Sequence, residues 1–367
     1  MIELFTTGSP AHYLGILVTL LAATLGSIHA LLHKRDPRSA VLWLGIIWLV
    51  PLVGVCLYLL LGVNRIRRRA LSLRAGLEPV RSRNSTHEYT LEQIESMLPV
   101  QHQYLHVLAA SGTRIIERPL VSGNQITLLQ NGDEAYPAML DAIRKARTSI
   151  ALSSYIFDSD AVGMEFVKAL AEAVGRGVAV RVLVDATGTW YSWPPIQRAL
   201  LDSQVPYARF LPSFSLWRLP SINLRNHRKL LVVDGQTGFT GGMNIREGHW
   251  LSRNPPHPVQ DLHFRVVGPV VSHLQEVFAE DWRFTTGETL EGPAWFPSID
   301  SSGSVISRGV ADGPDEDVDP MRWTFLAAIS AAKSSIRIAT PYFLPDPPLI
   351  SALNLAAMRG VRVQVLL

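Results

Sequence analysis

A histidine and a lysine stand two residues apart in the segment NHRKLLVVDGQTGFTGGMN, residues 226–244. Alternate residues of a strand point to the same face, so the side chains of His227 and Lys229 can address one ligand. An imidazole acts as a nucleophile or proton carrier near neutral pH, and an ammonium group can hold a phosphoryl oxygen. The pair therefore predicts chemistry on a phosphate ester, and the apolar run Leu230–Val233 predicts a buried strand that holds it rigid.

The residues after this run extend the candidate site. Asp234 precedes a glycine, and Asp-Gly is a strong hairpin-turn signal. Gly241 and Gly242 let the backbone approach a ligand closely, and the side chain of Asn244 can donate a further hydrogen bond. By strand alternation Asp234 faces away from His227, so a turn role and a direct role in the site both remain open for this carboxylate.

Short apolar strands alternate with amphipathic helices from residue 125 onward. QITLLQNG, IALSSYIF and VAVRVLVD are typical of strands, and YPAMLDAIRKARTS and VGMEFVKALAEAVGRG are typical of helices. This alternation predicts an α/β domain with a largely parallel sheet that is covered on both faces. Residues 64–115 before it predict a helical connector, with a helix that begins at Thr90 and a division at Pro99.

Two apolar segments, Leu14–Leu32 and Ala40–Val63, lie near the N-terminus. Each is long enough to cross a hydrocarbon core of about 30 Å. Pro51 allows a kink in the second segment without excluding a span. Residues 1–33 contain no Lys or Arg, unlike the basic start of a signal peptide. We therefore predict a two-helix transmembrane hairpin over residues 1–63.

Charge and cysteine content bound the possible functions further. The formal net charge is +3, and the segment NRIRRRALSLR after the second apolar segment carries five arginines. A basic cluster in this position favours contact with anionic lipid headgroups, or fixes membrane orientation. The positive-inside rule places both termini, and hence the soluble part, in the cytoplasm. Cys56 is the only cysteine, which excludes an intramolecular disulfide and a cysteine-based metal site.

The chain contains an internal repeat. LDAIRKARTSIALSSYIF (140–157) matches LAAISAAKSSIRIATPYF (326–343), and RGVAVRVL (176–183) matches RGVRVQVL (359–366). Two matches in order, at similar spacing, predict a duplicated lobe. The histidine motif begins about 45 residues after the first copy of the repeat, so its counterpart would lie beyond Leu367.

The pattern H-x-K-x4-D, followed by six residues and then G-G-x-N, resembles the signature of the phospholipase D superfamily. The two apolar segments and the stretches YIFDSD (155–160), DLHFRVVGPVV (261–271), EDW (280–282) and ATPYFLPD (339–346) resemble the bacterial cardiolipin synthase branch. The resemblance implies a phospholipase D-like α/β/α lobe over residues 116–290 and an inter-lobe linker over residues 291–320. The start of a second, incomplete lobe would follow over residues 321–367.

This resemblance also implies a reaction, a metal-independent phosphatidyl transfer that needs no cofactor. His227, Lys229 and Asp234 would be catalytic, and Asn244, Gly241 and Gly242 would bind the substrate. For the cardiolipin synthase branch, two phosphatidylglycerols would give cardiolipin and glycerol through a phosphohistidine. The implied partners are phospholipid and the bilayer of a bacterial inner membrane, with no nucleic acid, and a homo-oligomer is an open alternative.

The family uses two such motifs, whereas none of the other histidines here has a Lys two residues on. Three interpretations stay open: a protein that continues beyond this sequence, a site completed by dimerisation, and a catalytically incomplete membrane protein. Another phosphodiesterase of the superfamily, including a nuclease, is a further alternative that the apolar segments disfavour. A zinc site of His257, Asp261 and His263 lacks a recognised ligand spacing, and Asp160 is better explained as a helix N-cap.

Overall fold

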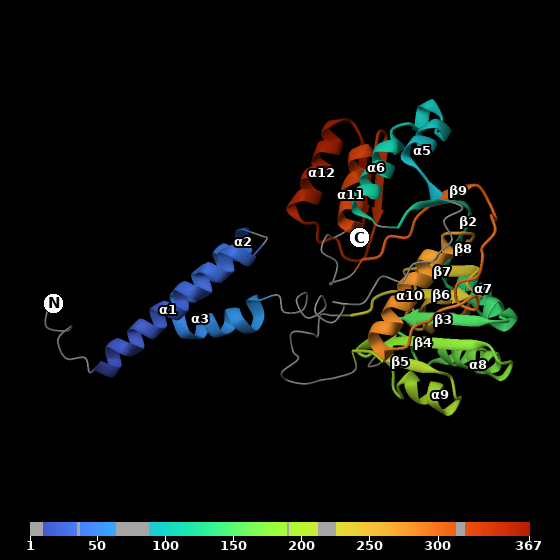
Figure 1. Cartoon of the computed structure of the whole chain (residues 1–367), viewed down its shortest axis with the longest axis horizontal. Helices are drawn as coiled ribbons and strands as arrows, with labels where there is room; N and C mark the ends of the chain where they lie inside the picture. Colours follow the sequence, from blue (N-terminus) through green and yellow to red (C-terminus); the bar gives the residue numbers. More distant parts are fainter. Residues whose placement is uncertain are drawn as a thin grey trace. The chain divides into compact units, whose positions relative to one another are not determined.

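The computed structural model describes residues 10–34, 37–63, 88–116, 118–188, 191–211, 225–312 and 320–367. These residues fall into two compact units (Figure 1). One unit holds the N-terminal helices, and the other holds everything described from residue 88 onward. The arginine cluster at residues 65–74 lies outside the described residues, as does Trp190.

The N-terminal unit contains α1 (Pro10–His33), α2 (Pro37–Leu49) and α3 (Pro51–Leu57), which continues as a π-helical turn over Tyr58–Gly62. The second apolar segment is therefore not a single helix. Pro51 has no N–H for the helix ladder and restricts the backbone of Val50, so the segment breaks there. Among the described residues, α1 is the one helix long and apolar enough to cross a membrane. The predicted two-helix hairpin is thus not confirmed.

The second unit begins with the helical connector. It contains β1 (Glu88–Tyr89), α5 (Leu91–Met97), a 3-10 turn over Val100–His102, and α6 (Leu105–Ile115). Thr90 caps α5, because its hydroxyl accepts a bond from the Gln93 N–H and the Gln93 side chain accepts one from the Thr90 N–H. The predicted helix start at Thr90 and the division at Pro99 are confirmed.

A nine-stranded sheet forms the centre of this unit. Its strands are β1, β2 (Leu120–Gln130), β3 (Ser149–Ser154), β4 (Ala179–Asp185), β5 (Tyr207–Phe210), β6 (Leu230–Val233), β7 (Thr237–Gly241), β8 (Leu262–Val267) and β9 (Val305–Ser307). The order is β1-β2-β8-β7-β6-β3-β4-β5, and β9 also pairs with β2. Among the described strands of this sheet, the parallel pairs are β3 with β4 and β4 with β5.

The expectation of a largely parallel sheet is therefore wrong. Strands β2, β8, β7, β6 and β3 pair antiparallel in that order. Helical crossovers join β3 to β4 and β4 to β5, and such crossovers return the chain in the same direction. The turn at Asp234, in contrast, joins β6 directly to β7, which forces the opposite direction.

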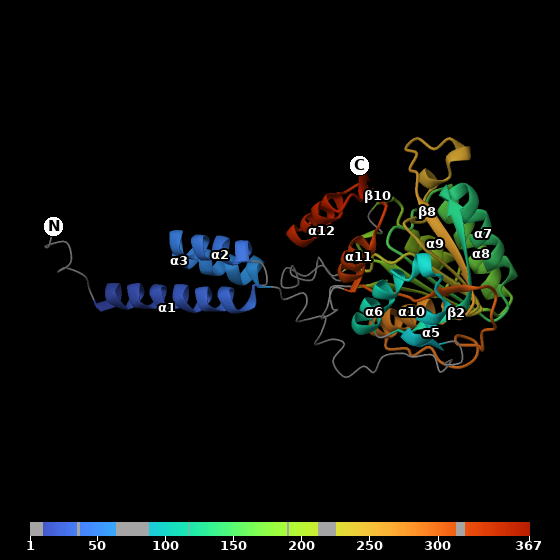
Figure 2. The ribbon, with the colours of Figure 1, turned by 90° about the horizontal axis from the view of Figure 1, so that it is seen from above.

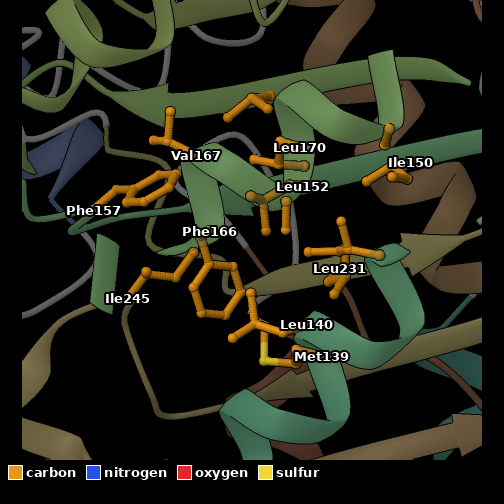
Figure 3. Packing of buried hydrophobic residues seen from close by; sticks show 14 of the residues in the cluster. Met139, Leu140, Ile150, Leu152, Phe157, Phe166, Val167, Leu170, Leu231 and Ile245 are labelled. Atoms are coloured by element: carbon orange, nitrogen blue, oxygen red, sulfur yellow. The ribbon is translucent and has the colours of Figure 1, made fainter. Parts of the chain in front are cut away.

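Helices cover the two faces of the sheet. Helices α7 (Asn131–Lys145), α8 (Ala161–Gly175) and α9 (Ile196–Asp202) pack on one face, and α10 (Val271–Thr286) packs on the other (Figure 1). Leu231 of β6 packs with Phe166 of α8 and Leu140 of α7 in the first core cluster (Figure 3). Its neighbour Val232 faces the other side of the sheet and packs with Phe278 of α10 in a second cluster of buried hydrophobic residues. This alternation fixes which side each residue of the motif segment faces.

A separate two-stranded sheet lies near the C-terminus (Figure 2). Its elements are α11 (Pro320–Ala331), β10 (Ser335–Ala339), α12 (Pro347–Met358) and β11 (Arg362–Leu366). Strands β10 and β11 pair in parallel with Ser335 opposite Arg362, and β3 and β4 pair in parallel with Ser149 opposite Ala179. The repeat aligns Ser149 with Ser335 and Ala179 with Arg362, so the two parallel pairs have matching registers.

Local details around the two parallel pairs also match. Asp160 caps α8 by accepting from the Gly163 N–H, which confirms the predicted N-cap. Asp346 caps α12 in the same way. Arg176 donates to main-chain oxygens at the end of α7, and Arg359 donates to the corresponding oxygens at the end of α11.

Candidate active site

His227 and Lys229 lie on the extended segment that leads into β6, one to three residues before the strand begins. Leu230 at the start of β6 is paired with Ser153 near the end of β3. The two residues therefore lie at the carboxyl edge of the parallel strands β3, β4 and β5. This edge is where open α/β sheets build their ligand sites.

The two side chains meet as the spacing predicts. Lys229 Nζ lies 3.1 Å from His227 Nδ1 and donates to the His227 main-chain oxygen at 2.7 Å. Lys229 is buried, with 7% of its surface exposed, whereas His227 is exposed. Burial lowers the pKa of Lys229 to about 8, although the carboxylates of Asp261 and Asp185 oppose the shift. Burial of the ring and the charge of Lys229 also lower the pKa of His227, so its imidazole is neutral at pH 7.

The ring of Tyr155 lies beside both His227 and Lys229 and forms one wall of the site. Its ring centroid lies 4.6 Å from that of His227, and Lys229 Nζ lies 5.4 Å from the same ring. The second contact is a cation–π interaction, which favours the charged lysine. Tyr155 is the first residue after β3, within the segment YIFDSD. The sequence interpretation used that segment only as a resemblance and missed the role of Tyr155.

Asn244 is held beside the same wall. Its Oδ1 accepts from the N–H of Ile156 at 3.0 Å, and its main-chain oxygen accepts from the Tyr136 hydroxyl at 2.7 Å. The first bond fixes the side chain next to Tyr155. The Asn244 Nδ2 has no partner in the part of the chain that the structure describes, so this donor remains for a ligand.

Gly241 is the last residue of β7 and Gly242 follows it at the same edge, and neighbouring residues explain both glycines. A Cβ on Gly241 would lie 2.7 Å from the Cα of His263, the residue paired with it on β8. A Cβ on Gly242 would overlap the carboxylate of Asp261. Close packing against β8 therefore requires glycine here, whether or not a ligand also approaches the backbone.

The structure places Asp234 at the opposite edge of the sheet. Its carboxylate accepts from the N–H groups of Arg147, Thr148 and Ser149 at 3.0, 2.7 and 3.1 Å, before and at the start of β3. Five residues of extended chain, about 17 Å, separate it from Lys229. Asp234 also adopts a positive φ of 53° in the turn to β7. Of the two roles left open for Asp234, its position supports the structural one, and the structure does not bring it together with His227 and Lys229.

Asn226 and Arg228 point to the other side of the motif segment. The Asn226 amide donates to Asp281 Oδ2 at 3.0 Å, and its N–H donates to Asp185 Oδ2 at 2.9 Å. Arg228 donates to both oxygens of Asp281 on α10. Sequence reasoning missed this anchor, although the alternation of Asn, His, Arg and Lys already indicated two polar faces.

Two buried histidines lie behind the site. His263 is 1% exposed, and burial lowers its pKa to about 4, with the charges of His249 and Lys229 adding to the effect. Burial likewise lowers the pKa of His249. Both rings are therefore neutral at pH 7, and neither adds charge to the surroundings of Lys229. Among the described residues, no group of three or more His, Cys, Asp or Glu side chains could hold a metal ion.

Comparison with known proteins identifies the family to which the chain belongs. The chain is 33% identical to "Cardiolipin synthase 1" of Bacillus anthracis over 349 residues, which cover 91% of this chain and 67% of that protein. The family model "Cardiolipin synthase, PLD-like domain" matches residues 139–282 and 325–367. The chain belongs to the cardiolipin synthase family of phospholipase D-like proteins. Members of this family are enzymes that act on phospholipids.

Further comparisons agree with this family. "Cardiolipin synthase A" of Pseudomonas fluorescens is 31% identical over 357 residues, covering 97% of this chain and 72% of that protein. A family model described as "Phospholipase D-nuclease N-terminal" matches residues 21–62, most of the N-terminal helices. The solved phosphatidylserine synthase of Haemophilus influenzae covers 71% of this chain and 65% of that protein, with a TM-score of 0.50 at 14% identity. That likeness shows a shared fold.

Proposed function

We propose that this protein transfers a phosphatidyl group between two phosphatidylglycerol molecules and releases cardiolipin and glycerol. The observation that carries the proposal is the exposed, neutral imidazole of His227, held against the buried ammonium of Lys229 at the carboxyl edge of the sheet. A nucleophile beside a fixed positive charge suits attack on a phosphodiester anion. The identity of the lipid rests on the cardiolipin synthase family.

In the first half-reaction, Nε2 of His227 attacks the phosphorus of one phosphatidylglycerol. A P–N bond forms, the P–O bond to glycerol breaks, and an acid gives its proton to the leaving glycerol oxygen. In the second half-reaction, the conjugate base of that acid takes a proton from a hydroxyl of a second phosphatidylglycerol. This oxygen attacks the phosphohistidine, the P–N bond breaks, and cardiolipin leaves with His227 restored. The covalent intermediate keeps the energy of the phosphodiester for the second alcohol.

Lys229 couples the binding of phosphate to the tautomer of His227, that is, to which ring nitrogen carries the proton. A protonated Lys229 that donates to Nδ1 requires the lone pair on Nδ1, which leaves the proton on Nε2. A bound phosphate draws the ammonium toward its oxygens, and the ring proton can then reside on Nδ1 while Nε2 becomes nucleophilic. The Asn244 Nδ2 supplies a second donor to the phosphate. Asp234, which lies at the far edge, acts as a positioning residue for the turn after β6.

The acid of this scheme belongs to a second histidine motif. We propose that residues 321–367 begin a second lobe equivalent to residues 116–290, after the inter-lobe linker of residues 291–320. The matching registers, caps and arginine contacts of the two parallel strand pairs support this proposal. The double match of one domain model also supports it. The second motif would come from residues outside this sequence or from a second copy of the chain.

The apolar helix α1 supports attachment to a membrane, where a phospholipid substrate resides. We place the catalytic lobe on the cytoplasmic side of the inner membrane, because the basic residues around the apolar segments favour that side. Residues 1–63 would then form the anchor and residues 64–115 the connector to the lobe.

The decisive experiment uses the protein isolated from its native membrane, in vesicles of phosphatidylglycerol labelled in the headgroup glycerol. We expect equal amounts of cardiolipin and free glycerol, and a loss of at least about 1,000-fold in rate for His227→Ala. His257→Ala, which changes an exposed histidine on a loop, is the matched control and should keep full activity. Phosphatidate in place of cardiolipin would mean that water is the acceptor. Either that product or an active His227→Ala variant would overturn the proposal.

A further inference from the structure

The two halves of the second apolar segment are too short to cross a bilayer separately. Helix α2 has 13 residues, α3 has seven, and the π-helical turn that continues α3 has five. These lengths correspond to about 20 Å for α2 and about 18 Å for α3 with its turn, whereas a hydrocarbon core is about 30 Å thick. Apolar helices of this length occur as buried core helices and as segments that enter a membrane and return, and the contacts of α2 and α3 distinguish these two cases.

Helix α3 folds back along α2. Gly54, just after the break, lies so close to α2 that a Cβ there would be 2.8 Å from the Cα of Ile47. In the π-helical turn that follows α3, the ring of Tyr58 lies 5.4 Å from that of Trp43, in the middle of α2. A Cβ on Gly62 would lie 3.0 Å from the same Trp43 ring. Successive residues of α3 and of its π-helical turn thus contact α2 in reverse order, and the bond of Tyr58 to His29 shows that the chain runs back toward the His33 end of α1.

This pair covers only the C-terminal half of α1. The Tyr58 hydroxyl lies 2.7 Å from Nδ1 of His29, and the Trp48 indole donates to the Ser27 hydroxyl at 3.0 Å. The buried residues of α1 are Ala23, Gly26, Ser27 and Ala30, whereas residues 12–18 are exposed. Helix α1 extends past the pair (Figure 2). The break, which follows Trp48, therefore lies beyond the level of Ser27, at least about 9 Å from the His33 end, whereas half of a hydrocarbon core is about 15 Å.

The polar groups at this depth are paired, and the surfaces around them are apolar. The indole of Trp48 and the hydroxyl of Tyr58 both bond to side chains of α1, so these two polar groups are satisfied within the N-terminal unit. Glycine at position 54 allows the two helices to approach closely, as small residues do between membrane helices. Leu49 and Leu61 are 83% and 74% exposed, which suits contact with lipid chains.

The distribution of charge agrees with this arrangement. Residues 1–33 contain no Lys or Arg, and the eight basic residues of the next segments are Lys34, Arg35, Arg38, Arg65, Arg67, Arg68, Arg69 and Arg74. A two-span hairpin would divide these eight between the two sides of the membrane. A pair that returns to its starting side keeps all eight together, as the positive-inside rule favours.

We propose that α1 crosses the bilayer and that α2 and α3 form a re-entrant pair. In this arrangement the pair enters the hydrocarbon of one leaflet from the side of Lys34 and returns to that side at Val63. The N-terminus then faces the opposite side from the chain that follows residue 63. The proposal differs from the two-span hairpin in one observable way, the side on which residues 1–9 lie.

The test compares three single-cysteine variants made in a Cys56→Ser background. Ser9→Cys reports on the N-terminal side, Asp36→Cys on the connection between α1 and α2, and Asp202→Cys on an exposed position of the α/β lobe. None of the three removes a basic residue. A membrane-impermeant maleimide is applied to intact cells and to permeabilised cells, and labelling in detergent gives the total reactive thiol.

We expect Ser9→Cys to react in intact cells, and Asp36→Cys and Asp202→Cys to react only after permeabilisation. A result in which Ser9→Cys and Asp202→Cys share a side and Asp36→Cys lies opposite would establish the two-span hairpin and overturn the proposal. Labelling of all three on one side would show that α1 does not cross, and would equally overturn it.

Discussion

Arg228 Nη1 donates to both carboxylate oxygens of Asp281, at 2.7 and 2.6 Å, while the next residue, Lys229, turns to the opposite side and contacts His227. Asp281 is 1% exposed and belongs to α10. Helix α10 thus holds one side of the motif segment through Arg228, and the other side of the segment carries His227, the proposed nucleophile. We therefore expect the direction of the His227 ring to depend on the contact between Arg228 and Asp281.

We expect Arg228→Met to lower kcat at least about tenfold with a smaller change in KM, because His227 loses its alignment but Lys229 remains. The free energy of unfolding should fall by about 3 kcal/mol, since the buried Asp281 carboxylate loses its charged partner. Arg228→Lys should restore part of kcat. Arg253→Met is the matched control, because it removes an exposed ion pair with Glu165 that is worth less than about 1 kcal/mol. An unchanged kcat in Arg228→Met would contradict this positioning role.

Asp234→Ala should act on stability and not on chemistry. Three backbone N–H groups and the Thr148 hydroxyl lose an ionised acceptor, which we expect to cost about 2–4 kcal/mol in the free energy of unfolding. The kcat of the folded protein should stay within about threefold of the original value. The reason is that five residues of extended chain, about 17 Å, separate Asp234 from Lys229. Urea unfolding and lipid turnover measure the two effects separately. Asp141→Ala, which removes an exposed carboxylate paired with Lys145, is the control. A large loss of kcat with unchanged stability would restore a direct role for Asp234.

The lowered pKa of Lys229 predicts an alkaline limit for the reaction. Because burial lowers this pKa to about 8, kcat/KM should fall above that pH as the ammonium loses its proton and phosphate binding weakens. The stability of the fold should change in the opposite direction to kcat/KM. Between about pH 8 and 10.5, Lys229 binds a proton in the unfolded protein but has lost it in the folded protein. The free energy of unfolding should therefore rise with pH. Lys229→Met should abolish the rise in stability and the alkaline limb together. A flat kcat/KM up to pH 10 would refute the assignment.

His227 sets the acid limb of the same profile. Its pKa lies below the ordinary value of 6.5, so the free enzyme should keep its neutral, nucleophilic imidazole to a lower pH than a solvated histidine would. Lys229→Met removes one of the two causes of this shift and should move the acid limb toward higher pH. The residual activity of that variant, followed with a sensitive headgroup-release assay, gives the limb. A limb that moves toward lower pH would exclude Lys229 as a cause.

Pro51→Leu should change the topology of the anchor. The substitution restores an N–H donor and lets α2 and α3 join into one helix over residues 37–62, about 39 Å long. That length spans a bilayer, so Ser9→Cys and Asp202→Cys should then label on the same side in a measurable fraction of molecules. Pro37→Leu is the control, because proline is tolerated at the first turn of a helix and its replacement should leave the labelling unchanged. No change with Pro51→Leu would indicate that Gly54 and the contacts to α1 hold the break without proline.

Local signals in the sequence were sufficient for several parts of the fold. The caps at Thr90 and Asp160 and the turn at Asp234 depend on residues within four positions, and all three were predicted correctly. The contact of His227 with Lys229 also follows from strand alternation alone. Each of these features is fixed by the chain immediately around it, which is why a single sequence is enough.

Features that depend on distant residues were not predictable in the same way. The antiparallel pairings of β6 with β3 and of β7 with β8 join segments that are far apart in the chain, so an apolar pattern does not reveal them. The Arg228–Asp281 contact joins residues 53 positions apart. The break at Pro51 was expected at most as a kink, because packing of Gly54 against α2 becomes visible only when both helices are in place.

Helices α2 and α3 cover only the C-terminal half of α1, and this has a consequence for membrane shape. In the arrangement proposed above, α1, α2 and α3 would share the leaflet near His33, while the exposed residues 12–18 of α1 would lie in the other leaflet without α2 and α3 beside them. An anchor with this outline is a wedge, which takes up more lateral area in one leaflet than in the other. We expect it to concentrate where the crowded leaflet lies on the outside of a bend, so that bilayer curvature itself would help to decide where in the cell its lipid is made.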